Sequence, residues 1–477
     1  MKKENAKILY VASEGVPFIA TGGMGEVIGA LPRALEDESS LEVRVVMPLY
    51  QQISEQHMEQ LTYLGYTYIP LSWRNQYCGV FKAEANGVTY YFIDDEYYFK
   101  RADCYGHYDD GERFAFFCKA VLSILPMIDF WPDIIHCHDW QSALVPVYLR
   151  TIFAQNDRYQ NIRSIFTIHN IEYQGKYDLA ILSDVFDLPP YDACFVEYDG
   201  CINLMKGAIE CADIVSTVSP TYAQEIFSPF YSHGLTPIIE RNSDKITGIL
   251  NGIDTNFYNP AIDKALFKPY NVDSMEDKYE NKAKLQEMVG LPVDKTIPVI
   301  AVISRLVSHK GIDLVAGAAE ELLHQNIQLI ILGKGDQGYE DYFRNLQYRH
   351  PDKVVAWIEY NPEVSRKIYA GADIFLMPSK SEPCGLAQMI ASRYGTVPVV
   401  RETGGLKDSI RDCTLGEGNG FTFVDYSAYN VVNAVGRALA LYYDKKNWNN
   451  LMREVMNVDF SWNNSAKEYL KLYDRLL

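Results

Sequence analysis

Two basic side chains stand close together just after an apolar run in the second half of the sequence. Arg305 and Lys310 follow IPVIAVI, in the stretch SRLVSHKG. Arginine offers a planar fork of donors and lysine a compact charge, so the two can converge on one diphosphate. A solvated basic loop is the alternative, but a net charge of −18 makes a cation pair at a strand end less expected by chance. We therefore predict that this pair binds an anion.

A carboxylate follows another apolar run, DIFLMPS, in the stretch KSEPCGL. Pro383 suits the first position of a helix, where its missing N–H costs little. Glu382 would then stand just ahead of the backbone N–H groups of Cys384 and Gly385. A carboxylate beside free backbone donors offers sugar hydroxyls one acceptor and several donors. A plain helix cap is the alternative interpretation.

Polar side chains also follow two apolar runs in the first half of the chain. His138 and Asp139 end DIIHCHD, and His169 and Asn170 end RSIFTIHN. Polar groups at two adjacent strand ends favour a binding site, so we expect both histidines to contribute to one. His136 lies inside its apolar run, and we interpret it as a hydrogen-bonded core histidine.

Two glycine-rich turns lead from apolar runs into predicted helices. Gly22 and Gly23 belong to TGGMG, with Glu26 in the first helical turn, and Thr403 and Gly404 open TGGL. Glycine permits close backbone approach, and a helix N-terminus presents free N–H groups to an anion. Both turns therefore suit phosphate, although a tight turn without a ligand is the alternative for TGGMG.

Several sequence motifs that would indicate other enzyme classes are absent. No D-x-D, G-x-x-x-x-G-K-[ST], H-E-x-x-H or G-x-S-x-G occurs in the chain, which disfavours ATP hydrolysis, zinc proteolysis and esterase chemistry. GKGDQG, at residues 333–338, matches G-x-G-x-x-G, but no acid follows the next strand at the distance a dinucleotide fingerprint requires. We therefore expect no nicotinamide cofactor, no other cofactor and no metal requirement.

The candidate site residues follow different apolar runs, so they can form one site only if the fold brings the ends of those strands together. Short apolar runs, typical of parallel strands buried on both faces, alternate with longer amphipathic segments. The runs lie at residues 7–13, 42–48, 133–139, 163–169 and 213–219, and again at residues 297–304, 327–333, 353–359, 373–379 and 396–402. Two such series predict an α/β protein with two doubly wound parallel-sheet domains, whose ligands bind at the carboxyl ends of the strands.

The domain boundary is predicted near NGIDTNFYNP. We expect an N-terminal domain over residues 1–250 and a C-terminal domain over residues 251–459. The final stretch, residues 460–477, is amphipathic, with an apolar stripe that we expect to contain Tyr469, Leu470, Tyr473 and Leu477. No strand follows it, so its pattern alone allows it to pack on either domain.

The net charge and the cysteine content of the chain indicate which partners and which compartment to expect. The net charge of −18 disfavours nucleic acid and anionic membranes as partners. Nine cysteines without a C-x-x-C pair favour a reducing compartment, and we predict the cytoplasm. The first apolar run is too short for a signal peptide, and no stretch of 18 apolar residues predicts a membrane helix.

Taken in order, these motifs resemble those of bacterial glycogen synthase and plant starch synthase. The resemblance covers nearly the whole chain and rests on TGGMGEVIGALP, YGHYDDGERFAFF, HCHDWQSALVPVYL, FTIHNIEYQG, NGID, SRLVSHKG, PSKSEPCGLAQM and ETGGLKDSI. It implies a GT-B fold, with two Rossmann-like domains facing a deep cleft and the C-terminal helix crossing back onto the first. It also implies a retaining transferase that adds glucose from ADP-glucose to the non-reducing end of an α-1,4-glucan, a glycogen or starch chain.

The resemblance also implies roles for particular residues. Arg305 and Lys310 match the cations on the donor diphosphate, Glu382 the carboxylate that holds the glucose, and His169 a histidine near its 6-hydroxyl. Asn251 also faces the donor, and Tyr360 stacks on the adenine. The donor-binding set is completed by Gly22, Gly23, Cys384, Gly385, Leu386, Thr403 and Gly404. Acceptor or supporting roles fall to Glu26, His138, Asp139 and Asn170.

Three positions depart from the family pattern. Ala20 stands where the family usually has lysine before T-G-G, Glu26 replaces aspartate, and His309 replaces glutamine. The first departure removes a charge expected near the donor. It leaves two alternatives open: a GT-B transferase that uses UDP-glucose or another donor, and a weakly active paralogue that binds glucan or regulates a synthase.

Overall fold

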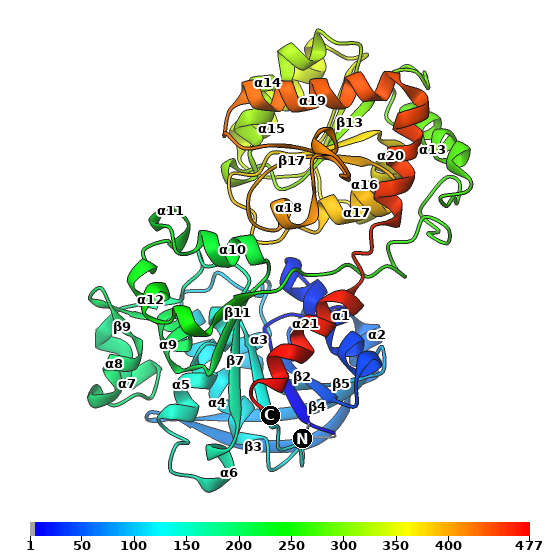
Figure 1. Cartoon of the computed structure of the whole chain (residues 1–477). Helices are drawn as coiled ribbons and strands as arrows, with labels where there is room; N and C mark the ends of the chain where they lie inside the picture. The colour runs from blue at the N-terminus through cyan, green and yellow to red at the C-terminus, as the bar shows by residue number, and fades with distance from the viewer. Residues whose placement is uncertain (1–4) are drawn as a thin grey trace. The chain divides into compact units, whose positions relative to one another are not determined.

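The computed structural model describes residues 5–477, which form two compact units, each with its own sheets and packed helices (Figure 1). Unit 1 ends at Gly252 and also contains Trp462–Leu477, whereas unit 2 is Ile253–Ser461. The chain thus leaves unit 1 after its last sheet strand and returns with a single helix.

Unit 1 is built on a nine-stranded sheet. In sheet order its strands are β12 (Ile246–Gly248), β11 (Ile214–Thr217), β7 (Arg163–Ile168), β6 (Ile134–His138), β1 (Lys7–Val11), β2 (Glu42–Pro48), β5 (Val88–Asp94), β4 (Arg74–Ala85) and β3 (Thr62–Leu71). The run from β12 to β5 is parallel, and β4 and β3 add antiparallel edge strands. The five predicted strands of the first half are confirmed, whereas the parallel strands β5 and β12 were not predicted.

The antiparallel edge was not predicted, because its strands lack a continuous apolar run. In β3, exposed Tyr66 and Tyr68 alternate with buried Ile69 and Leu71. Such alternation is typical of a strand with one face toward solvent. A small antiparallel sheet was also missed; its strands are two or three residues long: β8 (Lys176–Tyr177), β10 (Cys201–Asn203) and β9 (Glu197–Tyr198).

Unit 2 is built on a six-stranded parallel sheet. In sheet order its strands are β15 (Val354–Trp357), β14 (Gln328–Leu332), β13 (Val299–Ile303), β16 (Ile374–Met377), β17 (Val397–Arg401) and β18 (Phe421–Phe423). The five strands predicted for the second half are confirmed. Only β18 was missed, and three residues give too short a pattern to recognise.

Helices connect the strands in both units. Those of unit 1 are α1 (Gly23–Glu38), α2 (Glu55–Met58), α3 (Glu96–Phe99), α4 (Asp110–Ser123), α5 (Leu144–Arg150), α6 (Asp157–Gln160), α7 (Leu182–Val185), α8 (Ala193–Val196), α9 (Leu204–Cys211), α10 (Pro220–Glu225), α11 (Pro229–Ser232), α12 (Thr236–Arg241) and α21 (Trp462–Asp474). Those of unit 2 are α13 (Met275–Met288), α14 (Ile312–Leu323), α15 (Gln337–Arg349), α16 (Pro362–Gly371), α17 (Ala387–Arg393), α18 (Gly404–Ser409), α19 (Ala428–Tyr443) and α20 (Lys445–Asn457).

The C-terminal helix α21 packs beside α1 in unit 1 (Figure 1). Its buried stripe includes Tyr469 and Tyr473, as expected, but Leu470 is only half-buried and Leu477 is exposed. The other buried positions are Trp462, Ser465, Ala466 and Leu472. The predicted stripe was therefore partly wrong, because the helix begins at Trp462 and its buried face lies slightly to one side of the expected one.

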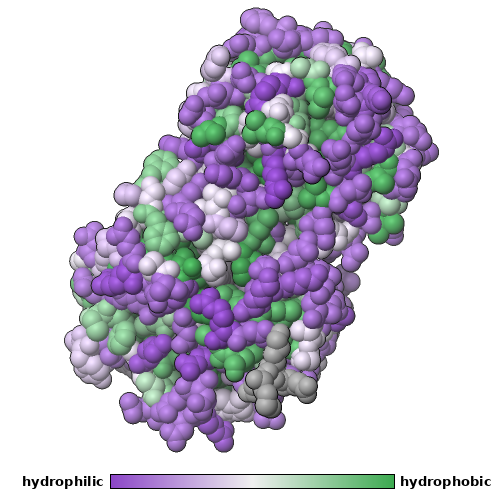
Figure 2. All heavy atoms as spheres, in the orientation of Figure 1, coloured by the Kyte–Doolittle hydropathy of each residue, from purple (hydrophilic) through white to green (hydrophobic). Residues whose placement is uncertain are grey.

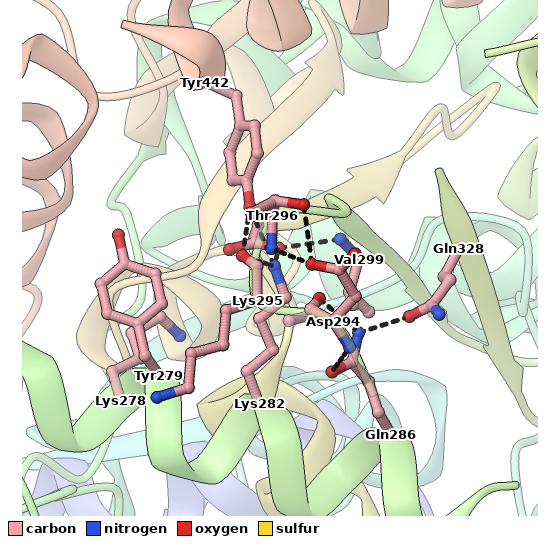
Figure 3. Close-up of polar contacts among 12 residues, drawn as sticks. Lys278, Tyr279, Lys282, Gln286, Asp294, Lys295, Thr296, Val299, Gln328 and Tyr442 are labelled. Carbon is pink, nitrogen blue, oxygen red and sulfur yellow. Dashed lines mark hydrogen bonds and ion pairs between the residues drawn. The ribbon is translucent and has the colours of Figure 1, made fainter. Parts of the chain in front are cut away.

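Helix α13 is tied to the start of two unit 2 strands by a buried lysine (Figure 3). The Lys282 ammonium donates to Asp373 Oδ2 at 2.7 Å, to the Tyr442 hydroxyl at 2.9 Å and to the Lys295 carbonyl at 3.1 Å. Asp373 Oδ2 also accepts the Val299 N–H at 2.8 Å. Val299 begins β13 and Asp373 directly precedes β16, so this ion pair fixes the helix at the amino ends of both strands.

Hydrophilic residues cover most of each unit's surface on the face shown in Figure 2, in keeping with the acidic composition. Across residues 5–477, no helix is both long and apolar enough to cross a membrane.

Candidate active site

In unit 2, two of the predicted residues form a direct ion pair. The Lys310 ammonium donates to Glu382 Oε1 at 2.8 Å and to Oε2 at 2.7 Å. The Ser379 hydroxyl donates to Oε2 at 2.9 Å. The Glu382 residue is 5% exposed, so its carboxylate is held by a cation and a hydroxyl in a largely dry setting. Its partner Lys310 remains partly accessible, with 18% of its side chain exposed.

The backbone holds the two loops of this pair in register. β13 and β16 are neighbours in the sheet, so their carboxyl ends adjoin. The Lys380 N–H donates to the His309 carbonyl at 2.9 Å. Gly311 has a φ of +72°, and a Cβ there would lie 2.1 Å from the Pro378 carbonyl oxygen. Only glycine allows this approach, which brings Lys310 over the loop that carries Glu382.

The predicted helix start at Pro383 is wrong. Helix α17 begins at Ala387, and Leu386 is its N-cap. The cause lies at Gly385, whose φ of +73° turns the backbone away from a helical path. A Cβ at Gly385 would lie 2.7 Å from Gln388 Oε1 and 3.1 Å from Glu382 Cγ, so glycine also lets the loop fold tightly over the carboxylate. Buried Cys384 therefore lies in a turn, not in a first helical turn.

A second helix start lies directly against the Glu382 backbone. Helix α18 begins at Gly404 after buried Thr403, as the TGGL turn predicted. A Cβ at Gly404 would lie 2.0 Å from the Glu382 carbonyl oxygen, and the Gly405 N–H donates to that oxygen at 3.2 Å. The structure thus gathers Lys310, Glu382 and the α18 N-terminus at the carboxyl edge of the unit 2 sheet.

Two further predicted residues are exposed near the same edge. Arg305 follows β13, and within residues 5–477 its guanidinium makes no hydrogen bond or ion pair. Tyr360 follows β15 and is 85% exposed. No hydrogen bond or ion pair joins either side chain to Lys310 or Glu382, and the exposure of both leaves them accessible to a ligand.

The GKGDQG motif has a packing role. A Cβ at Gly333 would lie 1.8 Å from the Ser304 carbonyl oxygen, and one at Gly335 would lie 2.1 Å from the Leu306 carbonyl oxygen. The Leu306 N–H also donates to the Lys334 carbonyl at 2.8 Å. The glycines therefore let the loops after β13 and β14 run side by side.

In unit 1, the first glycine turn is anchored by a buried acid that the sequence interpretation missed. Glu14 Oε2 accepts the Thr21 N–H at 2.6 Å and the Thr21 hydroxyl at 2.5 Å. Burial raises the pKa of the Glu14 carboxyl, and the hydrogen bonds from Thr21 partly oppose that effect. Exposed Gly22 is the N-cap of α1 and Gly23 its first residue, so the turn opens a helix N-terminus to solvent, as predicted. Its only sequence signal was an acid two residues after Ala12, the last apolar residue of the first predicted strand.

Glu26 lies in the first turn of α1 and is half-buried. Ala20 is exposed. A Cβ added at Gly25, in the first turn of α1, would lie only 2.5 Å from the Cβ of Ala20. The start of α1 therefore rests against Ala20.

The strand-end histidines of unit 1 are brought together. His138 Nδ1 and His169 Nε2 are hydrogen bonded at 2.9 Å. Asp139 Oδ1 accepts the backbone N–H of His169 at 2.7 Å and that of Asn170 at 3.4 Å. Burial raises the pKa of Asp139 to about 7, and these two backbone donors partly counteract it. The carboxyl group thus positions the His169 backbone, a role that its place after β6 did not reveal.

His136 is a hydrogen-bonded core residue, as predicted. Its Nδ1 bonds the Tyr473 hydroxyl at 2.9 Å and its Nε2 bonds the Thr167 hydroxyl at 2.6 Å. Asn251 follows β12 and is 6% exposed, and its side-chain oxygen has no hydrogen-bond partner among residues 5–477. An unpaired buried amide oxygen is costly, which marks it as an acceptor ready for a donor group.

The two sets offer complementary chemistry. Unit 2 presents a cation pair, a helix N-terminus and a carboxylate, which suit a diphosphate and a sugar. Unit 1 presents a glycine turn at a helix start, neutral imidazoles and amide groups, which suit phosphate oxygens and hydroxyls. Neither set contains an unambiguous nucleophile.

Comparison with known proteins gives one consistent result. A family described as "Starch synthase catalytic domain" matches residues 7–241, and one described as "Glycosyl transferases group 1" matches residues 283–454. The chain is 46% identical over 475 residues to a glycogen synthase of Clostridium botulinum (strain Alaska E43), covering 98% of this chain and 99% of the relative. It is 47% identical, at the same coverage, to a glycogen synthase of Clostridium beijerinckii.

A solved structure resembles the whole chain. The catalytic domain of starch synthase IV from Arabidopsis thaliana, bound to ADP and acarbose, aligns with a TM-score of 0.91 at 33% identity, covering 99% of both chains. Its agreement with two parallel-sheet α/β units identifies the fold as GT-B. With full-length relatives well above 30% identity, the chain belongs to the glycogen and starch synthase family of glycosyltransferases.

Proposed function

We propose that this protein is a glycogen synthase that transfers glucose from ADP-glucose to the non-reducing end of an α-1,4-glucan, with retention of configuration. The observation that carries the proposal is the ion pair of Lys310 with buried Glu382 beside the α18 N-terminus, in a chain whose full length matches glycogen synthases. The starch synthase IV neighbour was solved with ADP and the oligosaccharide acarbose bound, which supports both the nucleotide and the glucan.

In this proposal unit 2 binds the donor. Arg305 and Lys310 neutralise the diphosphate and stabilise the charge that grows on it as the glycosidic bond breaks. The Glu382 carboxylate accepts hydrogen bonds from hydroxyl groups of the glucose. The backbone N–H groups of Cys384, Gly385 and Leu386 donate hydrogen bonds to the donor. Thr403 and Gly404 open the helix N-terminus on this side, and exposed Tyr360 stacks on the adenine.

Unit 1 supplies the remaining contacts. Gly22 and Gly23 approach the phosphates, and His169 and Asn251 face the transferred sugar. Glu26, His138, Asp139 and Asn170 shape the acceptor side or support it. We therefore propose residues 1–250 with 460–477 as the acceptor domain and residues 251–459 as the donor domain.

The compartment follows from the cysteines. All nine are free thiols, six of them buried. We propose a cytoplasmic enzyme, because that compartment keeps thiols reduced.

A donor screen tests the function directly. Purified protein would be incubated with glycogen and radiolabelled ADP-glucose or UDP-glucose, each with and without excess EDTA. We expect label in the glucan from ADP-glucose, no loss on chelation, and release of the label by an enzyme specific for α-1,4 linkages. Incorporation from UDP-glucose alone would reassign the donor. Glucan binding without transfer from either donor would favour the regulatory alternative, which the exposed Ala20 motivates.

A further inference from the structure

Two histidines at neighbouring strand ends of unit 1 share one hydrogen bond and differ in exposure. His138 ends β6 and is wholly buried, whereas His169 follows β7 and is partly exposed. His138 Nδ1 and His169 Nε2 are 2.9 Å apart, and their ring centroids are separated by 5.2 Å. The inner ring can therefore influence the outer one, which reaches the surface.

Only one ring of such a pair can donate. Burial lowers the pKa of His169 to about 3 and that of His138 well below its usual value, so both rings are neutral near pH 7. A neutral imidazole carries one N–H donor and one bare acceptor nitrogen. One histidine must donate to the other, and the two assignments place the remaining protons on different atoms.

The second nitrogen of His138 decides between these assignments. His138 Nε2 is buried and has no hydrogen-bond partner anywhere in residues 5–477. If His169 donated, the His138 proton would be on Nε2, leaving a buried N–H without an acceptor, which is costly and rare. If His138 donates from Nδ1, only a bare nitrogen faces the interior. The geometry therefore favours His138 as donor and His169 Nε2 as acceptor.

The orientation of the His138 ring is fixed from both sides. Tyr10 stacks on it with ring centroids 5.1 Å apart, and His136 stacks at 4.4 Å. Tyr473 of the C-terminal helix bonds both of these neighbours, the Tyr10 hydroxyl at 2.5 Å and His136 Nδ1 at 2.9 Å. Rotation of the His138 ring would disturb a network that spans β1, β6 and α21.

We propose that His138 is a positioning residue that holds His169 in the tautomer with its proton on Nδ1. His169 then presents an N–H donor to a hydroxyl of the transferred sugar, because the hydrogen bond at one imidazole nitrogen sets the state of the other. The inference rests on the proposed function, which places His169 beside that sugar. The sequence placed His138 and His169 at strand ends but did not show that they contact each other.

A ligand-free measurement tests the tautomer without reference to activity. The protein would be labelled with ¹⁵N-histidine, and the resonances of His169 would be assigned by comparison with His169→Gln. We expect the spectrum at pH 7.5 to show a neutral His169 with its proton on Nδ1, and a shift toward the Nε2 tautomer in His138→Phe. A proton on Nε2 in the wild-type protein would overturn the proposal while leaving the enzyme's function untouched.

Kinetics test the consequence with matched variants. His138→Phe keeps an aromatic ring between Tyr10 and His136 but removes the donor, so we expect kcat/KM for the donor sugar to fall about 10-fold. His138→Asn places an amide N–H near the position of Nδ1 and should restore most of the loss. His324→Phe, at an exposed position of unit 2, controls for the substitution itself.

Thermal melting of each variant separates positioning from folding. A folded His138→Phe with wild-type kcat/KM, or a folded His138→Asn as impaired as His138→Phe, would overturn the proposal. Absence of glucosyl transfer by the wild-type protein would instead contradict the proposed function, and the ¹⁵N result would still decide the tautomer.

Discussion

The ammonium of Lys310 contacts both carboxylate oxygens of Glu382, at 2.8 and 2.7 Å. The residues that we assign to the diphosphate and to the glucose therefore form one ion pair. A donor phosphate that approaches Lys310 must share it with Glu382, which couples the binding of the phosphate to the position of the carboxylate. Removal of Lys310 leaves the Glu382 carboxylate buried without its cation, whereas removal of Glu382 leaves a partly accessible ammonium.

Replacement of Glu382 by alanine should nearly abolish glucosyl transfer while the protein stays folded. The carboxylate is the proposed acceptor for glucose hydroxyls, and without it Lys310 loses its partner. Transfer from ADP-glucose and thermal melting would be measured together. Glu363→Ala, which removes an exposed acid paired with Lys367 on α16, is the control. Full activity of Glu382→Ala would reject the site assignment.

Replacement of Arg305 or Lys310 by alanine should weaken transition-state stabilisation by about 2–4 kcal/mol each, as other lost preorganised donors do. Arg305→Ala should melt like the wild type because its guanidinium has no partner within residues 5–477, whereas Lys310→Ala leaves Glu382 unpaired. Because both act on one diphosphate, the double variant should lose less than the sum. Additive losses in kcat/KM would indicate separate roles; Arg344→Ala on α15 is the control.

Replacement of Lys282 by methionine should destabilise unit 2 by about 3–5 kcal/mol, because it leaves buried Asp373 without its cation. The two side chains are 1% and 2% exposed, so water cannot substitute. Urea unfolding would measure the loss, and hydrogen exchange of the β16 segment would locate it. Lys284→Met, an exposed position on the same helix, should melt like the wild type. Equal behaviour of the two variants would contradict the importance of the buried pair.

The histidine cluster should make unit 1 sensitive to acid. Burial lowers the pKa of His136 and of His169 to about 3, against about 6.5 when unfolded. Between these values the unfolded chain binds protons that the folded chain does not. The contribution of these two histidines to stability is therefore complete above pH 6.5 and falls as pH decreases through this window, by up to about 1.4 kcal/mol per pH unit for each. Asp139, whose pKa burial raises to about 7, contributes the opposite trend, so the histidine contribution is read from the difference between the wild type and a variant.

Urea unfolding of wild type and His136→Gln between pH 7 and pH 5 tests this relation. Glutamine keeps polar groups beside Tyr473 but cannot titrate, so the variant should lose less stability on acidification. Parallel pH profiles for the two proteins would contradict the assignment.

Because the histidines are neutral above pH 5.5, the rate profile should show no ionisation of His169 between pH 5.5 and 8.

Sequence patterns predicted most of the parallel strands, and with them the strand ends where the site lies, but they missed β5, although it is buried between β2 and β4. They missed β3 and β4 because Tyr66 and Tyr68 alternate with buried residues, a pattern less distinct than a continuous apolar run. They placed Lys310 and Glu382 at strand ends, but the contact between them depends on β13 lying next to β16. That neighbour relation is a matter of topology, which strand patterns alone do not encode.

Local conformation was the other limit. Pro383 matched a helix start, yet the positive φ of Gly385 moved the start of α17 to Ala387. The anchoring role of Glu14 depended on a hydrogen bond across the turn. The hydrogen bond between Tyr473 and His136, which stacks on His138, depended on a helix that returns from the far end of the chain. Such contacts emerge only when the fold brings distant segments together.

Replacement of Ala20 by lysine should raise kcat/KM for ADP-glucose. Ala20 is exposed and directly precedes Thr21, which Glu14 holds by two hydrogen bonds, so a longer side chain can extend from a fixed turn without displacing the core. The resemblance places a lysine at this position beside the donor phosphates. A hydrogen bond to a charged group contributes about 1.5–3 kcal/mol, so the gain can reach about 10–100-fold, less if another cation already compensates.

Ala20→Met, of similar length without charge, separates charge from bulk, and the gain should shrink with added salt. A lower kcat/KM in Ala20→Lys, with an unchanged melting temperature, would show that the donor site of this protein requires alanine at this position. That result would contradict the assignment of ADP-glucose as the donor.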